Sequence, residues 1–392
     1  MAYAARRPVF DADSHILELS DFLDPYVPEE KRGLLRRGVF EASKERLDAG
    51  IALAGQRRSD AAKAAEAEQR IMQDKGWSAM GAWDPIERSR ALDVLGFDAQ
   101  LVFSTFGTLL YKGTELDLYE GTSAFTRAMT DFCASDSRLL PVANIPLKDP
   151  KRAAAAATDA IERGCAAIMV PSTAAGDKAP THPELDPFWD TLSEAGIPFV
   201  LHVGGGGELI DKAFHNNNMP VSDHLGGGEN VRSKDYLGIP NSPSFFLGVL
   251  VLDGLFDRFP KLRGGCIEQG AVWVVSWLRH LDGALRYFGR TEEPLRRLTM
   301  KPSEYVSKHL KFTPYPGEPV GWMIEQAGGE LFLFSSDYPH PEGSTDPVGK
   351  FEATLDGVSD ADRERFYAGN FVEMVGDKVM TRIGDRQVAT PA

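Results

Sequence analysis

Pro8-Val-Phe-Asp-Ala-Asp-Ser-His15 begins as an apolar strand and ends in ionisable residues, and similar strands recur along the chain. Eight short runs have strand character: Pro8–His15, Ala99–Thr105, Leu140–Leu147, Cys165–Pro171, Pro198–Gly204, Leu262–Gly270, Leu310–Tyr315 and Leu331–Pro339. Helical patterns separate them, and several of these start at Asp, Ser or Pro and stop at Gly, as helix termini do. Alternating strands and helices predict a parallel sheet, and eight repeats predict an α/β fold closed into a (β/α)8 TIM barrel.

Two longer segments interrupt the alternation. Residues 29–82 are charged and rich in alanine, and they predict surface helices inserted after the first strand as a possible cap. Residues 204–241 follow the fifth strand and are rich in Gly, Asn and Pro. A long irregular segment after a barrel strand lies on the active-site face, where lids are found. No second domain is evident in the pattern, so we expect one domain over residues 1–392.

The composition of the chain limits the classes of molecule that it is expected to bind. The chain has 392 residues, a formal net charge of −14 and no run of Lys or Arg, which argues against nucleic acid and anionic membranes. No apolar run approaches the length of a membrane span, and residues 1–10 lack the apolar part of a secretory signal. Three dispersed cysteines, Cys133, Cys165 and Cys266, indicate buried thiols in a reducing compartment. We therefore expect a cytoplasmic protein that acts on a small molecule.

The end of the first strand carries three ionisable residues, Asp11, Asp13 and His15, at alternate positions. Residues i, i+2 and i+4 of a strand share one face, so the three side chains are expected to point the same way. Burying them inside a barrel is costly unless a bound cation compensates. The alternative is a strand that lies outside the barrel with a solvated acidic end.

Three later strands also deliver ionisable residues to their carboxyl ends: His202, Glu268 and Asp337. Taken alone, a histidine at the position of His202 is usually a core histidine satisfied by hydrogen bonds. The alternative for Glu268 is a carboxylate that interacts with the dipole of the helix that follows it. Because TIM-barrel active sites lie at the carboxyl ends of the strands, the residues together predict a metal site. Nitrogen and oxygen ligands without thiolate suit Zn²⁺, Mn²⁺ or Fe²⁺.

Several motifs carry a family resemblance: Asp11-Ala-Asp-Ser-His15-Ile-Leu-Glu18, Gly81-Ala-Trp-Asp-Pro85, His182-Pro-Glu-Leu-Asp186, His202-Val-Gly-Gly205 and Ser336-Asp-Tyr-Pro-His340. They resemble the amidohydrolase-related branch of the amidohydrolase superfamily, which includes aminocarboxymuconate semialdehyde decarboxylase, γ-resorcylate decarboxylase and many hydrolases. The resemblance implies a distorted TIM barrel and, position by position, a metal held by Asp13, His15, His202 and Asp337.

Two positions depart from the pattern of that branch. Asp13 stands where its members have His or Glu, which implies a harder site that is richer in oxygen. Glu268 is the nearest counterpart of a catalytic His that the decarboxylases carry after the sixth strand. Glu268 is therefore a candidate fifth ligand, or a bridge to a second metal ion to which Asp11, His224 or His340 contributes.

The main functional hypothesis is metal-assisted hydrolysis of an amide, ester, lactone or thioester. Asp337 would take the proton of the attacking water, Glu268 would act as a second base, and His340 or His224 would stabilise the oxyanion. The alternative is non-oxidative decarboxylation of an unsaturated or aromatic acid. Further alternatives are iron-dependent oxygen chemistry and a non-catalytic subunit that binds a partner.

The sequence also offers candidates for substrate contact and assembly. Arg232, within residues 204–241, is a candidate partner for a substrate carboxylate, and Phe103 and Trp322 are candidate pocket walls. The tryptophan-containing helix predicted over Ala271–Phe288 is a candidate interface for a homo-oligomer.

Overall fold

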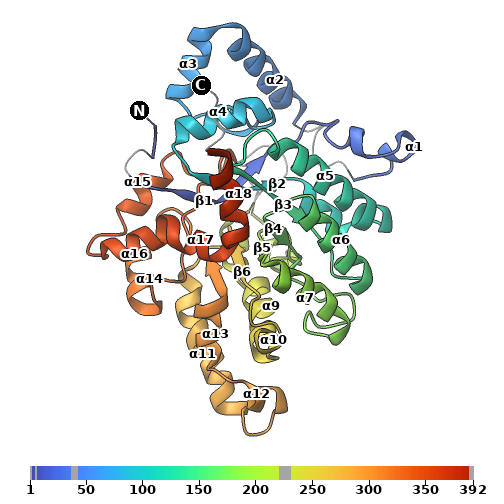
Figure 1. The fold of residues 1–392 in the computed structure, drawn as a ribbon, viewed down its shortest axis with the longest axis vertical. Coiled ribbons are helices and arrows are strands. Elements are labelled where there is room, and N and C mark those ends of the chain that lie inside the picture. The colour runs from blue at the N-terminus through green and yellow to red at the C-terminus, as the bar shows by residue number, and fades with distance from the viewer. Residues whose placement is uncertain (1, 5–6, 37–42, 220–230, 388–392) are drawn as a thin grey trace.

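The computed structural model describes residues 2–4, 7–36, 43–219 and 231–387. Its centre is a sheet of parallel strands in which each strand pairs with the one before it in the sequence. The strands are β1 (Phe10–Ile16), β2 (Ala99–Ser104), β3 (Leu139–Asn144), β4 (Ala167–Met169), β5 (Phe199–His202), β6 (Gly264–Ile267) and β7 (Leu310–Phe312). Helices surround the sheet, as the alternating pattern predicts (Figure 1).

The eighth predicted strand, Leu331–Pro339, is not a regular strand. It closes the barrel through isolated bridges, from Phe332 to Phe312 of β7 and from Tyr338 to Ser14 of β1. Backbone hydrogen bonds from Ala12 N to Phe334 O, at 3.1 Å, and from His15 N to Tyr338 O, at 2.8 Å, complete the seam. The register of β1 against β2 also shifts between Asp11 and Ser14, and the barrel is a distorted TIM barrel.

Helices follow most strands and begin and end where the sequence indicates. The helices of the barrel wall are α4 (Pro85–Leu95), α5 (Thr122–Cys133), α6 (Pro150–Glu162), α7 (Asp186–Ala195), α9 (Asn241–Leu252), α10 (Leu255–Arg258), α11 (Val272–Phe288), α13 (Pro302–His309), α14 (Val320–Ala327), α17 (Asn370–Val375) and α18 (Asp377–Gln387). Asp84 caps α4 by accepting from the amides of Ile86 and Glu87, and Gly96 ends it at a φ of 72°. Helices α9 and α10 are separate because Gly254, at a φ of 70°, lies between them.

The two insertions differ in kind. Residues 29–82 contain α1 (Glu29–Arg32), α2 (Lys44–Ser59) and α3 (Ala61–Gln69), and a buried ion pair of 2.8 Å between Arg57 and Glu87 fastens α2 to α4. Residues 204–241 are less irregular than the sequence predicts, because they contain the 3-10 turn η6 (Lys212–His215) and helix α8 (Ser233–Gly238). The candidate His224 lies outside the described residues.

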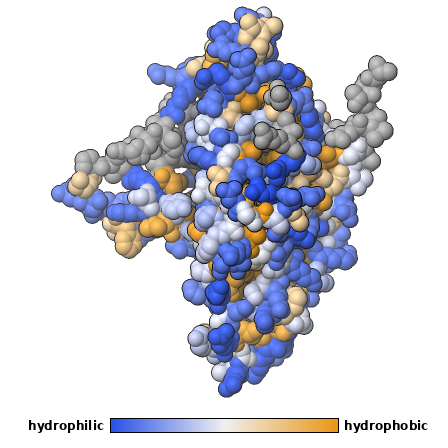
Figure 2. Space-filling view, turned by 90° about the vertical axis from the view of Figure 1, so that its left-hand side faces the viewer, coloured by the Kyte–Doolittle hydropathy of each residue, from blue (hydrophilic) through white to orange (hydrophobic). Residues whose placement is uncertain are grey.

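The face drawn in Figure 2 is predominantly polar, with apolar residues in separate patches. The three cysteines are free and buried, and burial raises the pKa of Cys165 to about 12, as expected for inert thiols. Within the described ranges, none of the helices combines the length and the apolar character needed to cross a bilayer.

Candidate metal centre

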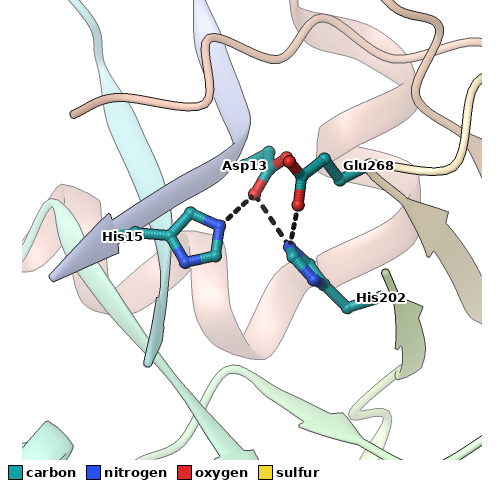
Figure 3. A group of neighbouring side chains, drawn as sticks. All are labelled: Asp13, His15, His202 and Glu268. Carbon is teal, nitrogen blue, oxygen red and sulfur yellow. Dashed lines mark hydrogen bonds and ion pairs between the residues drawn. The ribbon is translucent and has the colours of Figure 1, made fainter. Parts of the chain in front are cut away.

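Asp13 and His15 reach the inside of the barrel from the end of β1, and both are buried. The Oδ1 atom of Asp13 lies 3.2 Å from Nε2 of His15 and 3.3 Å from Nε2 of His202, which ends β5. Glu268 follows β6 and places Oε2 3.3 Å from the same His202 nitrogen (Figure 3). Three strand ends therefore bring two carboxylates and two imidazoles together at one point.

The proton of His202 is placed by its neighbours. Its Nδ1 atom lies 3.0 Å from the carbonyl oxygen of Val203. A carbonyl only accepts hydrogen bonds, so neutral His202 donates from Nδ1 and has a lone pair on Nε2. That lone pair faces the carboxylates of Asp13 and Glu268. Because a lone pair and two carboxylates repel one another, this arrangement favours a cation between them. A metal-binding histidine usually donates its other ring N–H to a backbone carbonyl or a carboxylate, as His202 does here.

Asp337 and Glu268 both have left-handed backbone, with φ values of 53° and 54°. Residues other than glycine rarely adopt this conformation, which costs on the order of 1–3 kcal/mol and is concentrated at functional sites. The amide of Asp337 donates to Asp13 O at 2.9 Å, and the amide of Glu268 donates to the hydroxyl of Thr313 at 2.8 Å. These bonds hold two strained residues so that their carboxylates face the site.

The donor set fits a divalent metal ion. Ligand atoms of Asp13, His15, His202 and Glu268 lie within 4.8 Å of one another, and so do those of His15, Glu268, Asp337 and His340. Among the described residues, the fully buried Asp13 Oδ2 and His15 Nδ1 make no hydrogen bond, and the contact of His15 Nε2 with Asp13 Oδ1, at 3.2 Å, lacks hydrogen-bond geometry. Burial and the neighbouring histidines lower the pKa of His15 well below its usual value, which leaves the ring neutral. Buried carboxylates and neutral imidazoles without partners are the state that metal binding requires.

His340 forms a pair with Asp337, with Nδ1 3.0 Å from Asp337 Oδ1. On its other side, Nε2 lies 2.8 Å from the hydroxyl of Thr105, and that hydroxyl donates to Ile16 O at 2.6 Å. Because the single proton of Thr105 is used on Ile16, His340 must donate from Nε2 and turn Nδ1 towards Asp337. The lone pair on Nδ1 of His340 therefore faces the Asp337 carboxylate.

Asp11, predicted as a ligand of a second metal ion or as a residue that supports the site from behind, lies beside the site and supports it through hydrogen bonds. Its carboxylate accepts from Gln100 Nε2 at 2.7 Å, from the hydroxyl of Ser336 at 2.6 Å and from the amides of Ser336 and Asp13. Burial raises its pKa to about 7. The register shift in β1 turns Asp11 away from the shared face that the alternation predicts. Asp11 thus ties β1 to β2 and to the closing segment, and it is not in either group of candidate ligands.

A cavity of about 910 Å³ opens over the six clustered residues. Arg232 lines it, as expected for a substrate contact. Phe103 does not line it, because its ring packs behind His202 with 4.7 Å between centroids. The prediction that Trp322 forms a pocket wall is also wrong, because Trp322 lies on α14, is 45% exposed and does not line the cavity.

Thr105 and Tyr315, which the sequence analysis did not single out, line the cavity and contact residues of the metal centre. The hydroxyl of Tyr315 donates to Glu268 O at 2.9 Å. Each is the last residue of a predicted strand, so a polar side chain at the carboxyl end of a barrel strand is the signal that indicates them.

Comparison with known proteins agrees with this architecture. The amidohydrolase family model matches residues 10–376. An amidohydrolase structure from Mycobacterium avium subsp. paratuberculosis K-10 is 20% identical, with a TM-score of 0.68 over 95% of this chain and 100% of that chain. The 5-carboxyvanillate decarboxylase of Sphingomonas paucimobilis is 18% identical, with a TM-score of 0.62 over 94% of this chain and 98% of that chain.

A third similar structure was solved with a metal ion. The dihydroxybenzoic acid decarboxylase of Polaromonas sp. JS666, with bound manganese and the inhibitor 2-nitroresorcinol, is 16% identical, with a TM-score of 0.62 over 95% of this chain and 99% of that chain. At these identities the structural likeness shows the fold. The family match extends over nearly the whole barrel, from Phe10 in β1 to Gly376 after α17, and the chain belongs to the amidohydrolase family.

Proposed function

We propose that the protein is a metal-dependent decarboxylase of an aromatic or unsaturated carboxylic acid. The observation that carries the proposal is the Asp337–His340 pair, 3.0 Å apart, which lies beside a metal-type donor set within one cavity. Similar structures that match almost the whole chain are decarboxylases of carboxylated or hydroxylated aromatic acids, and this supports decarboxylation over hydrolysis.

Asp13, His15, His202 and Asp337 would hold the metal ion, with Glu268 as a further ligand. When bound, such an ion supplies positive charge that anchors the carboxylate and hydroxyl oxygens of an acid. Manganese is the ion found in two similar decarboxylase structures. Arg232 lines the cavity beside α8 and would contact an anionic group of the substrate from that side.

Decarboxylation replaces a carboxylate by a proton, so that R–COO⁻ and H⁺ give R–H and CO₂. The protein must therefore deliver one proton to the carbon that loses CO₂. Asp337 is the donor in this proposal, because it faces the cavity and its Oδ1 atom lies 3.0 Å from Nδ1 of His340. Thr105 keeps Nδ1 of His340 directed at Asp337, so the imidazole can return a proton to the carboxylate after each turnover.

Hydrolysis is the second candidate, and Glu268 is the observation that favours it. Glu268 stands where related decarboxylases have a catalytic histidine, and it offers a second carboxylate 3.3 Å from His202. A second carboxylate is suited to act as the base for an attacking water.

The deciding experiment uses metal-free protein reconstituted with Mn²⁺ under anaerobic conditions. We expect release of CO₂ from one or more members of a panel that includes 2,6-dihydroxybenzoate, 5-carboxyvanillate and 1-hydroxy-2-naphthoate. In D₂O, the product should carry one deuterium at the carbon that lost the carboxylate. Cleavage of ester or amide substrates with incorporation of ¹⁸O from water, without any CO₂ from the acids, would contradict the proposal in favour of hydrolysis.

A further inference from the structure

The cavity is much larger than a single aromatic ring needs. Its volume is about 910 Å³, whereas about 150 Å³ accommodates a molecule the size of benzene. The six clustered ionisable residues occupy only one end of it. The rest extends beneath η6 and α8, where the lining includes Ile210, Tyr236, Ile239 and Tyr315, which we call the lid subsite.

An aromatic wall connects the metal centre to the lid subsite. Tyr315 is anchored at the metal centre, because its hydroxyl donates to Glu268 O at 2.9 Å. Its ring lies 6.0 Å from that of Tyr236 on α8, at an interplanar angle of 39°. Tyr236 is 48% exposed, so its ring offers apolar surface that a ligand in the cavity would remove from water.

Close packing holds the lid subsite in place. A Cβ atom added to Gly238 would collide with the carbonyl oxygen of Leu209 and lie 2.7 Å from Cγ2 of Ile210, so α8 rests directly on residues 209–210. Lys234 Nζ donates to Phe214 O at 2.6 Å and joins α8 to η6. Ile239 is only 4% exposed. The wall is therefore formed before a ligand arrives, which lowers the entropic cost of binding.

We propose that the lid subsite binds a second ring or a comparably bulky apolar group attached to the acid, so that the substrate is a polycyclic or bulky substituted acid and not a simple hydroxybenzoate. This proposal depends on the proposed function in one respect only, the placement of the carboxylate head group at the metal centre. The carboxylate and hydroxyl oxygens would lie at the metal centre, and the apolar group would lie along Tyr315 and Tyr236 beneath α8.

Binding to the Mn²⁺-loaded protein tests this without requiring turnover. We expect 1-hydroxy-2-naphthoate to bind on the order of tenfold more tightly than salicylate in isothermal titration, because the second ring buries additional apolar surface. The variant Tyr236→Ala should remove most of this difference while leaving the affinity for salicylate nearly unchanged. The matched control is Tyr287→Ala, which truncates a tyrosine that is 75% exposed on α11 and should alter neither affinity.

The possible outcomes test the lid subsite and the decarboxylase activity separately. Equal affinities for the two acids in the wild-type protein would overturn the lid subsite, as would an equal loss of both in Tyr236→Ala. Tighter binding of the naphthoate without release of CO₂ would support the subsite while contradicting the decarboxylase.

Discussion

Asp337 combines three properties that seldom occur together in one residue: a left-handed φ of 53°, a contact with His340 and a place in the candidate metal cluster. The variant Asp337→Asn tests its chemistry, because asparagine has the same shape and tolerates left-handed backbone. We expect kcat to fall by about 10²–10⁴-fold, the usual contribution of a positioned acid or base. Thermal unfolding should show an intact fold, and near-normal turnover would contradict the role of Asp337 as proton donor.

Thr105 is a positioning residue, because it acts through His340. In Thr105→Val the Nε2–H group of His340 loses its acceptor. The imidazole can then place its proton on Nδ1 instead, and in that tautomer Nδ1 cannot accept a proton from Asp337. We expect kcat to fall on the order of tenfold or more with little change in KM. Thr105→Ser, which restores the hydroxyl, should recover most of the rate, whereas a purely steric role predicts no recovery.

Glu18 is a buried acid with a testable pH signature. Burial raises its pKa from 4.5 to about 8. Below about pH 4.5 the folded and unfolded chains both bind this proton. Between 4.5 and about 8 the unfolded chain releases it while the folded protein retains it, so the stability contributed by the protonated group is lost as pH rises.

Replacing Glu18 by Gln removes that loss. The unfolding temperature of metal-free Glu18→Gln, relative to wild type, should therefore rise between pH 5 and pH 9. Glu30→Gln, on the exposed helix α1, should show no such trend. A difference from wild type that is the same at both pH values would mean that Glu18 ionises normally.

At the scale of elements, η6 and α8 line one side of the cavity, and contacts with residues 209–210 hold α8 in place. The Cβ of Gly238→Ala would collide with Leu209 and Ile210, so we expect a loss of about 1–3 kcal/mol in the free energy of unfolding. Gly55→Ala is the matched control, because Gly55 lies within α2 with no atom near its missing Cβ. That change should instead stabilise the protein by about 0.5–1 kcal/mol. Equal effects in chemical denaturation would contradict the close packing of α8.

At the scale of the whole molecule, the alternation of strands and helices predicts the barrel. It also predicts the meeting of Asp13, His15, His202, Glu268 and Asp337, because the carboxyl ends of the strands converge. The position of Asp11 was not predictable, because a register shift does not change the period of two in the sequence. Helix α8 was not predicted for another reason. Six residues do not form a stable helix alone, and α8 is stabilised by its contacts with residues 209–210, which the sequence pattern does not reveal.

The candidate metal centre joins residues from the first and the last segments of the barrel, so metal binding should stabilise the entire fold. Asp13 belongs to β1, and Asp337 belongs to the segment that closes against it. A ligand that binds only the folded chain, present at 100 times its Kd, adds about 2.7 kcal/mol to the free energy of unfolding. We therefore expect Mn²⁺ to raise the unfolding temperature of metal-free protein. Asp13→Asn should lose most of this increase, because the amide removes one negative charge without changing the shape of the side chain.

Two comparisons make the result specific to this centre. Glu162→Gln, which removes an exposed charge at the end of α6, should retain the full response to Mn²⁺. Metal content per chain, measured after removal of free ion, should fall in parallel with the thermal response of Asp13→Asn. If the unfolding temperature of Asp13→Asn rises as much as that of wild type, the ion binds elsewhere, because Asp13 Oδ1 lies between the two imidazoles that define the centre.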